Sequence, residues 1–130
     1  MVVEDNDDDM EAIERSLRRS QPGPLVHRLL DGTALVEWLM ERATLPELVL
    51  LDLGLPSGNG RHAIEAVKRT PAIAHPSVVV LTGTADPDEV AACHAAGADG
   101  YLVKASGFAL LHATLAAAME YWLRWTSARS

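Results

Sequence analysis

Residues 48–56 read LVLLDLGLP, and this stretch gives the clearest indication of the fold. Its first four residues are apolar, and an unbroken apolar run of this length is typical of a strand that is covered on both faces of a parallel sheet. Asp52 follows the run directly, before a loop that is rich in turn-forming residues. Similar runs at Val78–Leu81 and Tyr101–Val103 predict two further strands of the same kind.

Two weaker segments complete the set of predicted strands. Val2-Val3 predicts the end of a short first strand, and Leu25–Leu30 predicts a second strand. The polar pair His27-Arg28 inside that second segment indicates a position at the sheet edge. Apolar residues at helical spacing fill the segments between the strands. They predict helices around Met10–Leu17, around Leu35–Leu39, over 59–70, over 86–96 and, as the last helix, over about 106–126.

The alternation of strand and helix, repeated five times, predicts a parallel sheet with right-handed crossovers and helices on both faces. For a chain of 130 residues this pattern favours a single domain over residues 1–130. The expected fold is a flavodoxin-like, doubly wound α/β/α sandwich with strand order 2-1-3-4-5. Folds of this type bind ligands in a crevice at the carboxyl ends of strands 1 and 3.

The composition excludes several classes of protein. Hydrophobic residues make up 48% of the chain and charged residues 22%, which is ordinary for a globular domain. A net charge of −7 argues against a nucleic-acid surface, and the single cysteine, Cys93, excludes a disulfide framework. No apolar stretch reaches the ~20 residues of a membrane helix, and the first residues do not resemble a signal peptide. We therefore expect a cytoplasmic protein with no membrane or nucleic-acid partner.

Polar side chains follow four of the predicted strands at their carboxyl ends. Glu4 and Asp5 follow the first strand and Asp52 follows the third. Thr82 follows the fourth strand and Lys104 the fifth. Each of these residues alone is more often a turn or surface residue, but four coincidences at neighbouring strands are improbable. We expect three carboxylates, one hydroxyl and one ammonium group to share one crevice.

This constellation predicts magnesium and phosphoryl chemistry. Three carboxylates in one crevice raise one another's pKa values unless a cation neutralises them. Oxygen ligands alone suit a hard ion such as Mg²⁺ and argue against zinc. A carboxylate beside the ion can attack phosphorus, so Asp52 is the candidate nucleophile, with Lys104 and Thr82 contacting the transferred oxygens. The acidic run Asp7–Asp9 is explained as a helix start, where carboxylates favour the positive end of the helix dipole.

In four motifs, taken in order and with the family's spacing, the chain resembles the receiver domain of bacterial response regulators. The motifs are Glu4-Asp5, residues 50–56 (LLDLGLP), Leu81-Thr82-Gly83 and residues 97–104 (GADGYLVK). The stretch EDNDD at residues 4–8 is also similar to the stand-alone regulators that are paired with bacterial phytochromes.

The resemblance implies a role for each motif residue. Asp52 would accept a phosphoryl group from a sensor histidine kinase, and the similarity at residues 4–8 implies a bacterial phytochrome as that kinase. Thr82 and Lys104 would contact the phosphoryl group, and Tyr101 would turn inward when Thr82 moves toward it. The Mg²⁺ ligands would be Glu4, Asp5, Asp52 and the backbone carbonyl of Gly54.

The sequence departs from the family pattern directly after Lys104. The family usually has a cis-linked proline there, whereas this chain has Ala105, and a cis bond to a non-proline residue costs about 2.5–4 kcal/mol. A differently aimed loop would favour an alternative function, a binding module that works without phosphorylation. A third class, the Mg²⁺-dependent phosphohydrolases, usually has a second aspartate two residues after the nucleophile, where this chain has Gly54.

The predicted last helix suggests how the protein gives its output. No further domain is expected after it, so the signal would pass to a downstream protein or a phosphotransfer partner through direct contacts. Apolar residues span roughly 220° of this helix, more than docking on a sheet requires. We expect Trp122 and Trp125 to overhang the sheet and form a homodimer interface, the alternative being a tight cap on the sheet edge.

Overall fold

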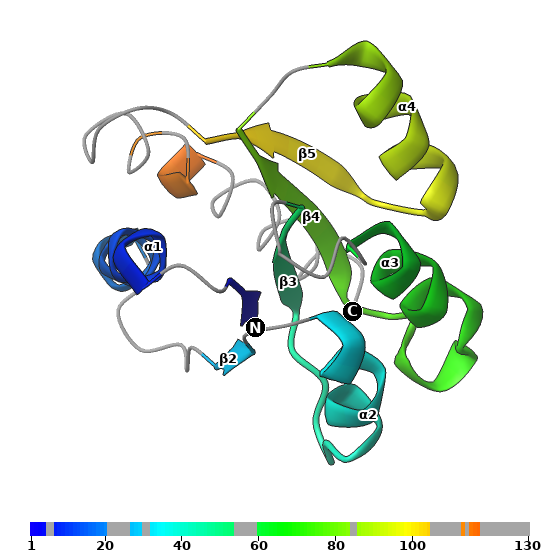
Figure 1. The fold of residues 1–130 in the computed structure, drawn as a ribbon. Coiled ribbons are helices and arrows are strands. Elements are labelled where there is room, and N and C mark those ends of the chain that lie inside the picture. Colours follow the sequence, from blue (N-terminus) through cyan, green and yellow to red (C-terminus); the bar gives the residue numbers. More distant parts are fainter. Residues whose placement is uncertain are drawn as a thin grey trace.

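A parallel sheet of five strands forms the centre of the protein (Figure 1). The computed structural model describes residues 1–4, 7–20, 27–29, 32–53, 60–83, 86–104, 113 and 115–117. The strands are β1 (Val2–Val3), β2 (Arg28–Leu29), β3 (Leu48–Asp52), β4 (Ser77–Thr82) and β5 (Gly100–Val103). They are all parallel and lie in the order β2-β1-β3-β4-β5. The predicted flavodoxin-like fold with strand order 2-1-3-4-5 is confirmed.

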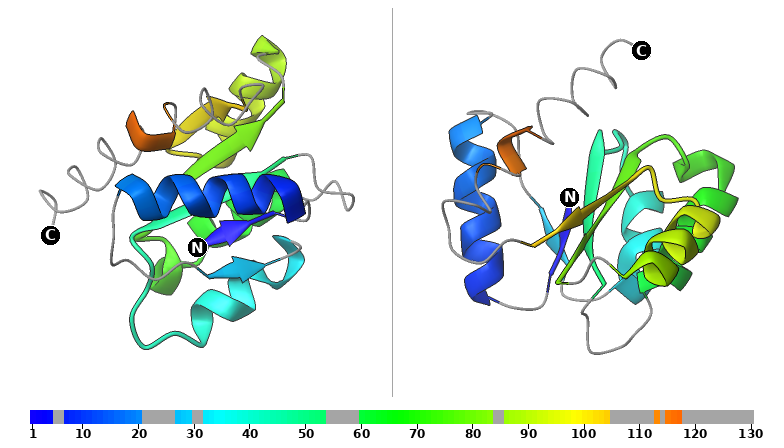
Figure 2. Two further views of the ribbon diagram at one scale, coloured as in Figure 1. Left: turned by 90° about the vertical axis from the view of Figure 1, so that its left-hand side faces the viewer. Right: turned by 90° about the horizontal axis from the view of Figure 1, so that it is seen from above.

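Helices cover both faces of this sheet (Figure 2). The α-helices are α1 (Asp7–Ser20), α2 (Leu35–Met40), α3 (Gly60–Arg69) and α4 (Pro87–Ala96), and the 3₁₀ turns are η1 (Gly32–Ala34) and η2 (Pro71–Ile73). Helix α1 and the short helical segment at residues 115–117 lie on one face, and α2, α3 and α4 lie on the other (Figure 2). The three layers therefore have the predicted α/β/α arrangement.

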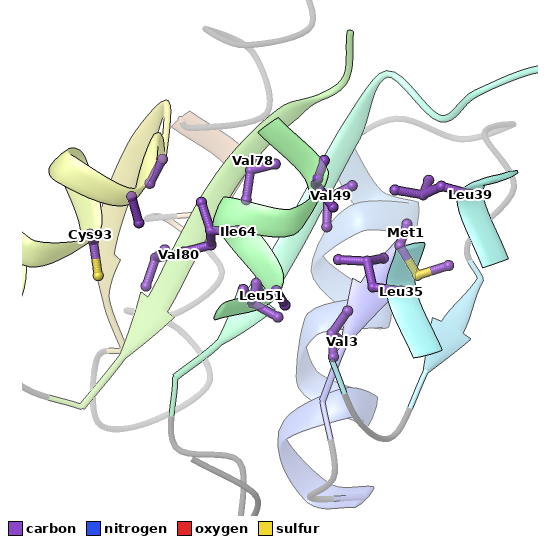
Figure 3. Packing of buried hydrophobic residues seen from close by; sticks show 14 of the residues in the cluster. Met1, Val3, Leu35, Leu39, Val49, Leu51, Ile64, Val78, Val80 and Cys93 are labelled. Carbon is purple, nitrogen blue, oxygen red and sulfur yellow. The ribbon is translucent and has the colours of Figure 1, made fainter. Parts of the chain in front are cut away.

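The alternation of side chains along the central strands divides the core in two. Val49 and Leu51 of β3 point to the face covered by α2, α3 and α4, where the core also holds Ile64 and Cys93 (Figure 3). The opposite face of the same strand packs against α1 and Leu115. Because both faces are covered, β3 and β4 are buried along their whole length, which explains why their sequences read as continuous apolar runs.

Helix α4 shows how local sequence sets an element's limits. The Asp86 side chain caps the helix by accepting a hydrogen bond from the backbone N–H of Asp88 at 3.0 Å, and Pro87 fills the first turn. At the other end Gly97 adopts φ = 109°, a left-handed conformation that glycine reaches without a Cβ penalty. The chain then turns directly into β5.

The weaker predictions have mixed outcomes. Strand β2 lies at the sheet edge as expected, where it pairs with β1 through Arg28 and Leu29. Of the last helix, predicted over 106–126, the structure describes residue 113 and residues 115–117 as helical, and Leu115 is buried beneath α1. Trp122 and Trp125 lie outside the described residues. Among the helices that the structure does describe, none combines the length and the apolar character of a membrane span.

Candidate functional site

Parallel pairing brings the predicted site residues to one edge of the sheet. Val3 of β1 is in register with Leu51 of β3, so Glu4 follows β1 at the level of Asp52. Asp52 pairs with Leu81 of β4, and Thr82 pairs with Val103 of β5. The backbone N–H of Lys104 donates to the Thr82 carbonyl at 2.6 Å, which holds the residue beside the end of β4.

The ammonium group of Lys104 is the centre of the site. Its Nζ donates to Asp52 Oδ2 at 2.8 Å and to Glu4 Oε2 at 2.9 Å. A third bond, of 2.8 Å, goes to Asp9 Oδ2. An ammonium group has three N–H donors, so these three carboxylates use them all. Residues from the end of β1, the first turn of α1 and the end of β3 therefore meet on the side chain of Lys104, which is 52 to 100 residues away from them in the sequence.

Among the four described side chains of this cluster, negative charge exceeds positive charge, and two of the three carboxylates are buried. Glu4 is fully buried, Asp52 is 5% exposed, and one lysine faces three carboxylates, which leaves a formal charge of −2. Burial alone would lower the pKa of Lys104, but hydrogen bonds to Asp52, Asp9 and Glu4 outweigh it and hold that pKa well above its usual value. The ammonium form is thus fixed, and the excess of negative charge among these four side chains favours the binding of a cation.

The site fits a hard divalent ion. One carboxylate oxygen from each of Glu4, Asp9 and Asp52 can be chosen so that all three lie within 4.8 Å of one another. The donor set consists of oxygen atoms, which Mg²⁺ and similar ions prefer. Glu4 and Asp52 are two of the predicted ligands. The other two, Asp5 and the Gly54 carbonyl, lie outside the described residues, as does Ala105.

Asp9 is a site residue that the sequence analysis missed. The acidic run at residues 7–9 was explained by the helix dipole, and Asp9 does lie in the first turn of α1. A signal was present in the helical spacing. Asp9 is four residues before Ile13, which is fully buried, and therefore lies on the same side of the helix. Asp7 and Asp8 lie elsewhere around the helix and are exposed.

Thr82 and Tyr101 form a second, connected part of the site. Thr82 is buried at the end of β4, and Tyr101 on β5 is half-buried against the core. Burial raises the pKa of the Tyr101 hydroxyl, hydrogen bonding from Thr82 opposes that rise, and Glu89 of α4 reinforces it. Tyr101 is therefore within hydrogen-bonding reach of Thr82 and of Glu89. The residue predicted to contact a phosphoryl group is thus linked to α4 through Tyr101.

Comparison with known sequences places this site in a family. The model of the response regulator receiver domain matches residues 1–116. The probable methanogenesis regulatory protein FilR2 of Methanothrix harundinacea is 32% identical over 129 residues, which cover 96% of this chain and 83% of FilR2. Response regulator Rcp1 of Synechocystis is 30% identical over 128 residues, covering 95% of this chain and 87% of Rcp1. The regulatory protein KdpE of Escherichia coli is 37% identical over 121 residues, 92% of this chain and 50% of KdpE.

Solved structures give the same result. The phosphorylated cyanobacterial phytochrome response regulator RcpA superposes with a TM-score of 0.86 at 28% identity, covering 94% of this chain and 91% of RcpA. The Mn²⁺-bound form of Rcp1 gives a TM-score of 0.82 at 29% identity, with coverage of 94% and 91%. A response regulator from Hahella chejuensis gives 0.81 at 34% identity, with coverage of 94% and 92%. This chain belongs to the response regulator receiver domain family.

Proposed function

We propose that the protein is a phosphorylatable switch of a two-component system, in which Asp52 accepts a phosphoryl group from the phosphohistidine of a sensor kinase. The observation that carries this proposal is the 2.8 Å contact between the buried Asp52 and Lys104, at a site where three carboxylates share this one ammonium group. A structural ion pair needs one anion for one cation. A site that must hold Mg²⁺ and a phosphoryl group needs the additional carboxylates.

The proposed step is an in-line displacement at phosphorus. An Asp52 carboxylate oxygen forms the new P–O bond while the P–N bond to the kinase histidine breaks, and the imidazole nitrogen keeps that electron pair and takes up a proton. Glu4 and Asp52, with Asp5 and the Gly54 carbonyl, would hold Mg²⁺, which when bound offsets negative charge on the transferring oxygens. Lys104 and Thr82 each donate a hydrogen bond to those oxygens.

The conformational response would run through Thr82. When its hydroxyl turns to the phosphoryl group, Tyr101 loses its interaction with Thr82 and is free to move inward. Tyr101 also faces Glu89, so its movement changes a contact with α4. We propose that the surface of α4 and β5 is the one whose shape depends on phosphorylation.

The relatives suggest the kind of partner. Rcp1, RcpA and two bacteriophytochrome response regulators are all similar to this chain. We propose a bacterial phytochrome as the cognate kinase, a cytoplasmic location, and a stand-alone regulator that passes its signal to a downstream protein or a phosphotransfer partner. A homodimer formed through Trp122 and Trp125 of the last helix belongs to the same proposal. The structure of Rcp1 with bound Mn²⁺ supports a divalent metal at the site.

Intact mass spectrometry tests the phosphoacceptor. The protein is incubated with Mg²⁺ and a small phosphodonor such as acetyl phosphate, and we expect the mass of one phosphoryl group to be added. Asp52→Asn should abolish the gain, since an amide cannot form the acyl phosphate, whereas Asp8→Asn should leave it intact. No gain in the unaltered protein would favour the phosphorylation-independent module, and rapid turnover of phosphate esters would favour a phosphohydrolase.

A further inference from the structure

We infer that Asp9 is a displaceable counter-ion of Lys104, which occupies the N–H donor that a phosphoryl oxygen takes once Asp52 is phosphorylated. The inference rests on the proposed function and adds a positioning residue to it. In this view Asp9 holds Lys104 in place before phosphorylation and then competes with the phosphoryl group for the same ammonium.

The hydrogen bonds of Lys104 limit how a phosphoryl group can bind it. All three donors of its ammonium group are used, by Glu4, Asp9 and Asp52 at 2.8–2.9 Å. A phosphoryl group on Asp52 can take over the donor that the Asp52 carboxylate uses now. A phosphoryl oxygen that takes a further donor must replace Glu4 or Asp9, and the question is which of these two can leave.

Burial identifies Asp9 as the group that leaves. The Glu4 side chain is 0% exposed and that of Asp52 is 7% exposed, whereas the Asp9 side chain is 43% exposed. A buried carboxylate that loses its cation bears an uncompensated charge, which is strongly unfavourable. Asp9 can exchange Lys104 for water because its place on the first turn of α1 already borders solvent.

Charge gives the direction of the effect. A phosphorylated Asp52 brings more negative charge than the carboxylate it replaces, and Asp9 repels it across a short distance. Removing the Asp9 charge should therefore favour the phosphorylated state. At a separation of ~5 Å in a largely solvated setting the repulsion corresponds to about a fivefold change in affinity.

The chain contains a matched control for this charge. Asp8 is the preceding residue in the same turn of α1, is exposed, and is not among the partners of Lys104. Asp8→Asn and Asp9→Asn remove the same formal charge and alter the helix start alike. A difference between them reports the contact with Lys104.

The first test measures binding of beryllofluoride, a mimic of the phosphoryl group, at saturating Mg²⁺. We expect Asp9→Asn to bind it about fivefold more tightly than the unaltered protein, and Asp8→Asn to bind it nearly unchanged. Equal or weaker binding by Asp9→Asn would overturn the inference. If Asp9→Asn instead needs more than tenfold more Mg²⁺ and gains no affinity at saturation, Asp9 is a metal ligand and the inference is also wrong.

The second test observes the displacement itself. The chain has only two lysines, Lys68 and Lys104, so lysine-selective NMR labelling gives two resolvable side-chain signals. Without ligands, Asp9→Asn should shift the Lys104 signal and leave that of Lys68 in place. With Mg²⁺ and beryllofluoride, the Lys104 signals of the two proteins should coincide, because Asp9 has then left.

Two outcomes separate this inference from the proposed function. If the unaltered protein gains no phosphoryl group and binds no beryllofluoride, the proposed function fails and the inference fails with it. If it does both, but the Lys104 signals of the unaltered protein and Asp9→Asn still differ in the saturated state, Asp9 stays bound and only the inference fails.

Discussion

The two lysines of the chain lie at opposite ends of the sheet and have opposite kinds of surroundings. At the amino ends of β4 and β5, Lys68 Nζ contacts one carboxylate, Asp99 Oδ2 at 2.8 Å, and donates to the Pro76 carbonyl at 3.1 Å. Asp99 also accepts the backbone N–H of Val78 at 2.7 Å. At the carboxyl ends, Lys104 faces three carboxylates.

The ratio of cations to carboxylates distinguishes a structural ion pair from a functional one. Lys68 and Asp99 neutralise each other, and neutral backbone groups complete their hydrogen bonds, so the cluster is finished as it stands. In the Lys104 cluster three carboxylates, two of them buried, share one ammonium group, so this cluster favours the binding of a further cation. An unbalanced cluster of this kind indicates a site that is built for a ligand.

Replacing each lysine in turn should give the largest difference in stability between the two clusters. Lys104→Met should lower the free energy of unfolding by about 3–5 kcal/mol without metal, because three carboxylates then lose their cation. Mg²⁺ should restore part of that loss by supplying positive charge. Lys68→Met should cost only about 1–2 kcal/mol, and Mg²⁺ should not restore it. Urea unfolding with and without Mg²⁺ measures both; equal losses and equal Mg²⁺ responses would contradict the comparison.

Neutralising one aspartate at each end should change stability in opposite directions. Asp99→Asn removes the carboxylate that pairs with Lys68 and should destabilise the fold by about 2 kcal/mol. Asp52→Asn relieves repulsion among three carboxylates and should stabilise the metal-free protein by about 1 kcal/mol, while phosphoryl transfer is lost. Thermal unfolding in the presence of a chelator gives both values. Destabilisation by Asp52→Asn would show that its charge is already balanced.

A substitution at Gly97, beside Lys68, should have a smaller effect on stability. Gly97 adopts φ = 109°, and a Cβ atom there would meet Lys68 Cγ at 2.9 Å. Gly97→Ala should therefore destabilise the fold by about 1 kcal/mol and displace the Lys68 stem. Phosphorylation of Asp52 should continue at its normal rate, because Lys104 lies at the other end of the strands. A matching loss of phosphorylation at a temperature where the variant stays folded would show that the two ends are coupled.

Much of the fold could be predicted because parallel strands buried on both faces leave a clear pattern. Continuous apolar runs located β3, β4 and β5. Strand–helix alternation then predicted a parallel sheet, and the chain length favoured the flavodoxin-like strand order. Strand β2 was harder to place, because a two-residue edge strand with a polar arginine carries little apolar signal.

The site was predictable wherever its residues follow a strand. Glu4, Asp52, Thr82 and Lys104 stand at strand ends, and the topology alone brings such positions together. Asp9 was not predicted as a site residue because it lies on a helix, and a favourable interaction with the helix dipole already accounts for an aspartate there. The ion pair between Lys68 and Asp99 was not predicted for a different reason. It depends on how α3 packs against the start of β5, and no local pattern in the sequence encodes that packing.

The burial of Cys93 has a consequence for watching this protein at work. It is the single thiol of the chain, lies fully buried on α4, and has its pKa raised, mainly by burial and also by Glu89. A thiol reagent can reach it only when α4 moves away from the sheet, so the rate of thiol labelling reports how often this local opening occurs. Helix α4 also carries Glu89, which lies near Tyr101, so the Cys93 thiol reports on the proposed signalling surface without an engineered probe.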